Sequence, residues 1–221
     1  MLIHPAEARR QFRDYAAGEI TNENLARGAL LIALEDYPRI DVESYLDELD
    51  ALAARVERRC VPGEPPIFRL GHLHAEMFDV DHYTGDTRNY YDTRNGYLNE
   101  VIDRKVGIPI TLSIVFLHVA TKLGLNASGV GLPGHYVVKV HFELNEVYVD
   151  PFHDGTTLTV PEIAEMVKHL GGGPLSSEHL RAWSGRETLV RVLGNLQNMW
   201  TRSGDPRRVQ AAKERLEILR A

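Results

Sequence analysis

Cysteine is almost absent from this sequence of 221 residues, which contains only Cys60. A single cysteine excludes an internal disulfide and a zinc site built from several thiolates. A thiol enzyme would therefore have to use Cys60. This residue follows a charged helix end and precedes the linker-like stretch Val61–Pro66, with no predicted base or helix N-terminus to activate it. We interpret Cys60 as a thiol without a catalytic role.

Excess positive charge and long apolar runs are also missing. The formal net charge is -6 and the pI is about 5.9, whereas binding to a phosphate backbone needs a concentrated basic surface. The longest apolar run, Ile108–Val119, is too short and too interrupted to span a bilayer, and the N-terminus lacks a secretory hydrophobic region. We expect a cytoplasmic protein whose partners include neither nucleic acid nor a membrane.

The composition that is present is typical of a folded chain, with 43% hydrophobic and 25% charged residues. The Pro/Gly-rich stretch Val61–Pro66 is the best internal boundary. We therefore expect a helical N-terminal domain over residues 1–62, a core over 67–180, and a helix-turn-helix cap over 181–221.

Helical periodicity predicts helices at both ends of the chain. Asp41 is placed to cap one of them, and Pro38 stops the helix before it. The last two meet at Ser203–Pro206 and resemble one tetratricopeptide-type repeat, which cannot bury its apolar face alone. We expect a cap packed on the preceding domain rather than a peptide-binding array. The expected helices are Leu25–Tyr37, Val42–Arg59, Ile67–Val80, Leu189–Trp200 and Val209–Leu219.

The centre of the chain changes from helical to strand periodicity. Pro109 begins an apolar helix that Gly124 closes, and a helix so apolar is expected to be buried. Residues 135–142 then alternate between apolar and polar side chains, and Val147–Asp150 supplies a second strand after Asn145. A buried helix followed by an antiparallel hairpin predicts an α+β fold.

Three features of this region have the chemistry of acyl transfer. A helix N-terminus at Pro109 offers a positive dipole end and free amides to a nucleophile, and His135 opens a strand from which it can accept a proton. Asp150 ends the next strand, where a carboxylate can fix the tautomer of the histidine. The histidine and aspartate also have plainer interpretations, as a packed residue at a strand start and as a turn cap.

The motifs of this region resemble the SirB1-type branch of the transglutaminase-like superfamily. The resemblance implies a papain-like α+β core with a Cys, His, Asp triad, in which His135 matches the histidine and Asp150 the aspartate. It also covers the leading helices and the trailing helix pair. The motifs are Tyr90–Asn95, Leu98–Val101, Gly107–Ser113, Leu123–Gly124, Gly129–His135 and Asp150–Phe152.

The resemblance places the position of the nucleophilic cysteine at Pro109, which has no nucleophilic group. Ser113 lies one turn later on the same helix face, and Thr111 lies in the first turn, so either hydroxyl is a candidate replacement. A turn is about 5 Å long, more than the reach of a hydrogen bond between nucleophile and base tolerates. The alternative is that both hydroxyls bond backbone carbonyls of the helix.

The pairing of His135 with Asp150 depends on the hairpin turn. With a turn centred on Asn145, Asp150 faces Val140, so contact with His135 requires a bulge or a tighter turn near Phe142–Glu143. The family resemblance, which places an aspartate at a similar remove, favours the contact.

A second group of candidates lies ahead of the helix, in the first motif. Asn95 is a candidate oxyanion donor, or else a turn residue bonding local backbone. Arg94 either binds a carboxylate or pairs with Asp92, Glu100 or Asp103, and Tyr91 completes the expected binding set with Pro109. No helical His/carboxylate spacing of the metal-binding kind occurs among the scattered histidines, His153 included, so we expect no metal and no cofactor.

Three functions follow from these patterns. The favoured one is a site that has lost thiol chemistry and binds a peptide, an amide side chain or a protein partner in a regulatory role. The second is an amide hydrolase or acyl transferase that uses His135 and Asp150 with Ser113, Thr111 or water. The third is a scaffold whose helical ends bind partners. The oligomeric state is left open.

Overall fold

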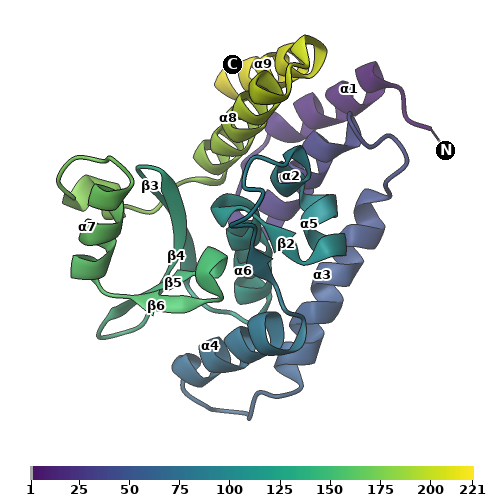
Figure 1. The fold of residues 1–221 in the computed structure, drawn as a ribbon. Coiled ribbons are helices and arrows are strands. Elements are labelled where there is room, and N and C mark those ends of the chain that lie inside the picture. The colour runs from purple at the N-terminus through teal and green to yellow at the C-terminus, as the bar shows by residue number, and fades with distance from the viewer. Residues whose placement is uncertain (1) are drawn as a thin grey trace.

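The computed structural model describes residues 2–221 and combines helices with a small antiparallel sheet (Figure 1). This confirms the expected α+β class. Along the described residues, no helix has both the length and the apolar character needed to cross a membrane. The α-helices are α1 Pro5–Ala16, α2 Asn22–Leu34, α3 Val42–Glu57, α4 Pro66–His74, α5 Leu98–Arg104, α6 Pro109–Lys122, α7 Val160–His169, α8 Gly185–Ser203 and α9 Pro206–Arg220.

The main sheet has four antiparallel strands in the order β3-β4-β5-β6. Val138 of β4 stands opposite Val149 of β5, and Val140 stands opposite Val147. A two-stranded parallel pair, β1 with β2, lies outside this sheet. The strands are β1 Thr84–Gly85, β2 Val106–Gly107, β3 Ala127–Leu132, β4 His135–His141, β5 Glu146–Asp150 and β6 Thr156–Leu158.

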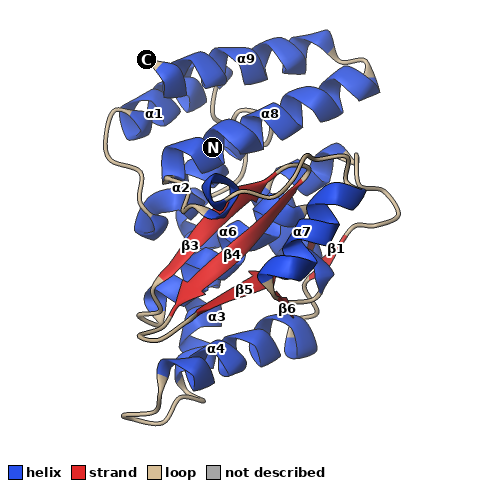
Figure 2. Ribbon diagram, turned by 90° about the vertical axis from the view of Figure 1, so that its left-hand side faces the viewer, coloured by secondary structure: helices blue, strands red, loops and turns tan. Residues whose placement is uncertain are grey.

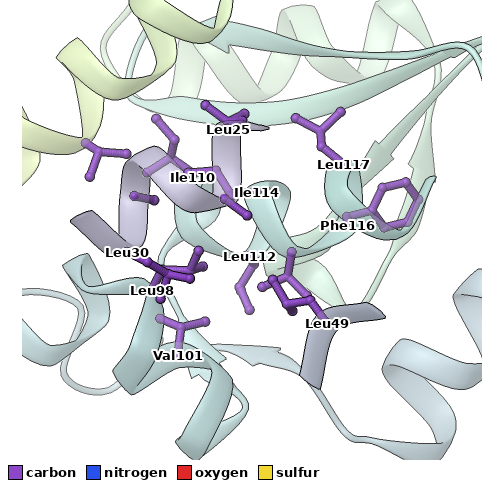
Figure 3. Packing of buried hydrophobic residues seen from close by; sticks show 14 of the residues in the cluster. Leu25, Leu30, Leu49, Leu98, Val101, Ile110, Leu112, Ile114, Phe116 and Leu117 are labelled. Carbon is purple, nitrogen blue, oxygen red and sulfur yellow. The ribbon is translucent and has the colours of Figure 1, made fainter. Parts of the chain in front are cut away.

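Helix α6 lies at the centre of the molecule. Every residue from Pro109 to Ala120 is buried, because α2 and α3 pack against the helix on one side and β4 on another. Figure 3 shows Leu112 and Ile114 of α6 among leucines from the surrounding helices. The predicted burial of this helix is confirmed.

Two hydrophobic clusters fill the two faces of the sheet. The α6 face carries the large one, which includes Tyr136, Val138 and Val140. On the other face, α7 covers a smaller cluster that includes Val137 and Tyr148 (Figure 2). The sheet is therefore buried between α6 and α7, and β4 is buried from His135 to Val140, although its α7 face carries the polar residues His135 and Lys139.

The large cluster also joins the two ends of the chain. It runs from Ala8 in α1 to Leu219 in α9, and Figure 1 shows the α8–α9 pair beside α1. Residues 181–221 thus pack on the rest of the protein as a cap. The boundaries at residues 62, 67 and 180 stay a prediction, since one core crosses all of them.

The structure confirms one predicted helix cap and differs from the sequence-based expectation at several other elements. Asp41 caps α3 as predicted, since its side chain accepts hydrogen bonds from the N–H groups of Glu43 and Ser44. The expected helix 67–80 changes at His74 from α4 into a π-helix, Ala75–Val80. Helices α1, α5 and α7 and strands β1, β2, β3 and β6 were not predicted.

A buried charge network holds the C-terminal helix against α2. The guanidinium of Arg215, which is 1% exposed, pairs with Glu35 at 3.7 Å and with Asp36 at 3.3 Å. Asp36 also accepts a hydrogen bond of 2.8 Å from the hydroxyl of Tyr97, which in turn accepts one of 2.8 Å from the indole of Trp200. Five residues from four segments therefore fix one another.

We expect Arg215→Ala to lower the free energy of unfolding by about 1.5–3 kcal/mol, because Glu35 and Asp36 lose their shared buried cation while each keeps one other arginine, Arg9 and Arg208. Arg207→Ala is the control, since Arg207 is exposed on the same helix and its loss should cost under about 0.5 kcal/mol. Urea denaturation of both variants measures the difference. Equal stabilities would show that the network contributes nothing.

Candidate functional site

The ends of β4 and β5 bring His135 and Asp150 together. The distance from His135 Nε2 to Asp150 Oδ2 is 2.8 Å, and the two side chains are 6% and 0% exposed. Since Val138 is opposite Val149, continuing the antiparallel register puts Asp150 opposite Val137, on the face it shares with His135. Diagonal neighbours of this kind are close enough for long side chains to meet.

The turn that sets this register is tighter than expected. Phe142 donates its N–H to the carbonyl of Asn145 at 2.9 Å, so Glu143 and Leu144 form the tip. Of the two turns considered, the one centred on Asn145 does not form, and Val140 stands opposite Val147 instead of Asp150. A tighter turn was the condition for contact with His135, and the structure meets it.

Asp150 performs two structural tasks with its two oxygens. Oδ1 accepts hydrogen bonds from the N–H groups of Phe152 at 3.0 Å and His153 at 3.4 Å, which caps the 3-10 helix η3, Pro151–His153. Oδ2 faces His135 Nε2 at 2.8 Å and His153 Nδ1 at 2.7 Å. The turn-capping and histidine-orienting interpretations therefore both hold.

The charge state of Asp150 follows from these contacts. Burial by itself would raise its pKa, but the hydrogen bonds and charges of His135 and then of His153 outweigh burial and hold the pKa below its usual value. Asp150 is therefore a carboxylate at neutral pH. As an acceptor, it requires His135 to donate from Nε2, which leaves Nδ1 free of any hydrogen bond within residues 2–221.

His153 is the site residue that sequence reasoning missed. Its side chain is 54% exposed, so it forms the solvent side of a cluster whose other two members are buried. The signal in the sequence was the spacing of Asp150 and His153 across Pro151, which puts both on one short turn. A search for helical spacing could not detect it.

Aromatic rings form one wall of the cluster. The ring of Phe152 lies 5.9 Å from that of His135 and 5.9 Å from that of Tyr90, edge to face in both cases. Strand β1 closes behind it, because a Cβ added at Gly85 would collide with the Phe152 backbone and ring. The motif that begins at Tyr90 therefore reaches His135 through Phe152.

The start of α6 offers no accessible hydroxyl. Pro109 is the first residue of the helix and has no N–H to donate. The hydroxyl of Thr111 accepts the N–H of Ile108 at 3.2 Å and lies 2.9 Å from the carbonyl oxygen of Asn95. Ser113 is 0% exposed, and its Oγ has no partner among the described residues. Both hydroxyls face the protein interior.

The candidates of the first motif have structural partners. Asn95 is fully buried, donates to Asp86 at 3.0 Å and accepts from Arg104 at 3.2 Å. Arg94 pairs with Asp92 at 2.6 Å. Tyr91 is exposed and packs under the guanidinium of Arg202, 3.9 Å from its ring centre. These side chains fix the loop between β1 and α5.

Cys60 stands apart from all of these residues. Its Sγ lies 3.5 Å from the carbonyl oxygen of Val56. Burial and the neighbouring carboxylate of Glu64 raise the pKa of the thiol to about 11. Among residues 2–221, no histidine hydrogen-bonds to its Sγ.

Comparison with known proteins identifies the family of this chain. The profile of the transglutaminase-like superfamily matches residues 43–194, more than half of the chain. The chain belongs to this superfamily. It is 34% identical over 184 residues to a UPF0162 protein of Xylella fastidiosa, with 78% of this chain and 63% of that protein covered. The chain thus spans less than two thirds of that relative.

Two further relatives have lower sequence identity. A UPF0162 protein of Vibrio cholerae is 24% identical, with 79% of this chain and 65% of that protein covered. Human F-box only protein 21 is 24% identical over 226 residues, with 89% of this chain and 35% of that protein covered. No solved structure matches the chain.

We expect the thiol of Cys60 to be unreactive at neutral pH. With a pKa of about 11, the thiolate fraction at pH 7 is about one in ten thousand. The alkylation rate by iodoacetamide should rise about tenfold per pH unit from 7 to 9 without a plateau. A plateau below pH 8.5 would show a thiolate that its surroundings stabilise.

Proposed function

We propose that this protein is a member of the transglutaminase-like superfamily without nucleophilic chemistry, whose site binds an amide group of a peptide or protein partner. The observation that supports this most is the intact His135–Asp150 contact at 2.8 Å in a chain whose nucleophile position, by family resemblance, is Pro109. The orienting half of a triad is kept, and the attacking half is missing.

Proline at this position removes two functions at once. It has no side-chain nucleophile, and it has no backbone N–H, the kind of group that donates to an oxyanion in acyl-transfer sites. Loss of one oxyanion donor alone typically lowers kcat by about 10²–10³. Substituting another nucleophile nearby would therefore restore only part of the lost rate.

The neighbouring hydroxyls do not compensate. Thr111 is 0% exposed and holds the helix N-terminus, and Ser113 is 0% exposed in the core. A serine or threonine needs a base within about 2.6–3.2 Å to become a nucleophile. Their burial supports a binding role over an enzyme that uses either hydroxyl.

The chemistry around His135 suits an amide. Its free Nδ1 is a hydrogen-bond acceptor for an N–H group when Nε2 donates to Asp150. The rings of Phe152 and Tyr90 supply apolar surface beside it. An amide-bearing side chain such as glutamine has both a donor and an apolar stem to match.

A second candidate function keeps His135 as a base. Its Nδ1 can accept a proton from water while Asp150 stabilises the resulting imidazolium, which is the arrangement of a water-dependent amide hydrolase. The low pKa of Asp150 favours this alternative, because an ionised orienting carboxylate is required.

We expect a glutamine-containing peptide to bind without being turned over. NMR titration with N-acetyl-Gln-Gly should shift the imidazole resonances of His135 and leave those of His169, exposed at the end of α7, unchanged. Ammonia release and peptide cleavage should equal those of His135→Ala. Turnover more than about tenfold above that variant would favour the hydrolase, and an unshifted His135 would refute amide binding at this site.

We also expect Pro109→Cys to install thiol chemistry. In a Cys60→Ala background, the introduced thiol should react with p-nitrophenyl acetate about 100-fold faster than when His135→Ala is added, the typical contribution of a general base. Ser113→Cys in the same background is the control, since Ser113 lies about one helical turn, roughly 5 Å, from the proposed nucleophile position and is 0% exposed. Equal rates for all three variants would show that Pro109 is not at the nucleophile position.

A further inference from the structure

Three donor atoms meet where β4 begins and β5 ends. His135 Nε2 and His153 Nδ1 each lie against the same atom, Asp150 Oδ2, at 2.8 and 2.7 Å. All three atoms lie within 4.8 Å of one another. The proposed amide site uses Nδ1, on the opposite edge of the His135 ring, and shares with this cluster only the contact of His135 with Asp150; His153 has no role in that proposal.

We propose that His135, Asp150 and His153 bind one divalent transition-metal ion, with zinc as the best match. Two imidazole nitrogens and one carboxylate oxygen are ligands that zinc takes at about 2.0–2.2 Å. Ion binding requires rotations of the two imidazoles that bring the three atoms to that distance from a common point. Imidazole ligands also suit nickel and copper, whereas magnesium and calcium require oxygen ligands.

The central ligand is held in place before any ion binds. Asp150 is 0% exposed, and its other oxygen, Oδ1, is fixed by the backbone N–H groups of Phe152 and His153. Hydrogen bonding to the second oxygen is the usual support of a ligating carboxylate. Oδ2 is therefore presented to the two histidines with little freedom to move.

The histidines can also change tautomer without losing a partner. Coordination through Nε2 of His135 and Nδ1 of His153 requires each ring to carry its proton on the other nitrogen. Within residues 2–221 neither of those other nitrogens makes a hydrogen bond to protein. The ion thus replaces two N–H donors on Oδ2, and the protons shift within the rings.

The site has an entrance and an open position. His135 is 6% exposed and Asp150 0%, whereas His153 is 54% exposed, so an ion enters from solvent past a side chain that can rotate. Three protein ligands leave one position of a zinc tetrahedron for water or another oxygen ligand. This is the arrangement of an accessible zinc site rather than a closed structural one.

Zinc binding can be measured on untagged protein treated with a chelator. Calorimetric titration with zinc chloride should give one ion per chain, and His153→Ala should weaken the affinity by at least about 10–100-fold, the range seen even for loss of indirect ligand support. His153 is half exposed, so this variant should fold normally. His135→Ala should weaken the zinc affinity to a similar extent.

Two controls decide the interpretation. His169→Ala removes an exposed histidine elsewhere and should leave the affinity unchanged, and magnesium chloride should give no binding. Zinc should also raise the melting temperature of the wild type but not of His153→Ala. No saturable zinc binding, or equal affinity in His153→Ala, would overturn the proposal. Neither result involves the peptide, so amide binding is tested separately.

Discussion

The burial of α6 is the constraint on which the remaining structure depends. A helix that is apolar on all sides must be covered on all sides, and here α2, α3 and the sheet supply the cover. The same burial encloses the hydroxyls of Thr111 and Ser113 in the protein interior. Pro109, the first residue of α6, is the one that lies at the helix end. The candidate nucleophiles are removed by the same packing that stabilises the fold.

The sequence predicted elements whose signals are local. Asp41, Pro109 and Gly124 mark helix ends by their own chemistry, and the apolar pattern of β4 identifies a strand. Strand β3 was not predicted, because Gly129 and Gly131 interrupt its apolar pattern. Both positions require glycine, since a Cβ would collide with Tyr136 at Gly129 and with Trp183 at Gly131. Helix α7 did carry a signal, the capping box in which Thr159 and Glu162 bond each other.

The site was harder to predict because it depends on distances across the sheet. His135 and Asp150 were identified from their places at the strand ends and by family resemblance, while their contact depends on a hairpin register that the sequence alone left open. The role of His153 depends on the 3-10 turn after β5, whose geometry is set by Asp150 itself. Asn95 was predicted as a candidate donor to an oxyanion, but its side chain instead donates to Asp86 and accepts from Arg104.

The tight turn at Glu143 and Leu144 has a consequence for how this chain can vary in evolution. Leu144 is 97% exposed, so its identity is free to change, but the pairing of β4 with β5 on either side of the turn is not. A slip of β5 by one position would exchange the faces of Val149 and Asp150 and separate Asp150 from His135. Selection on this hairpin therefore acts on its register and not on the side chain at its tip.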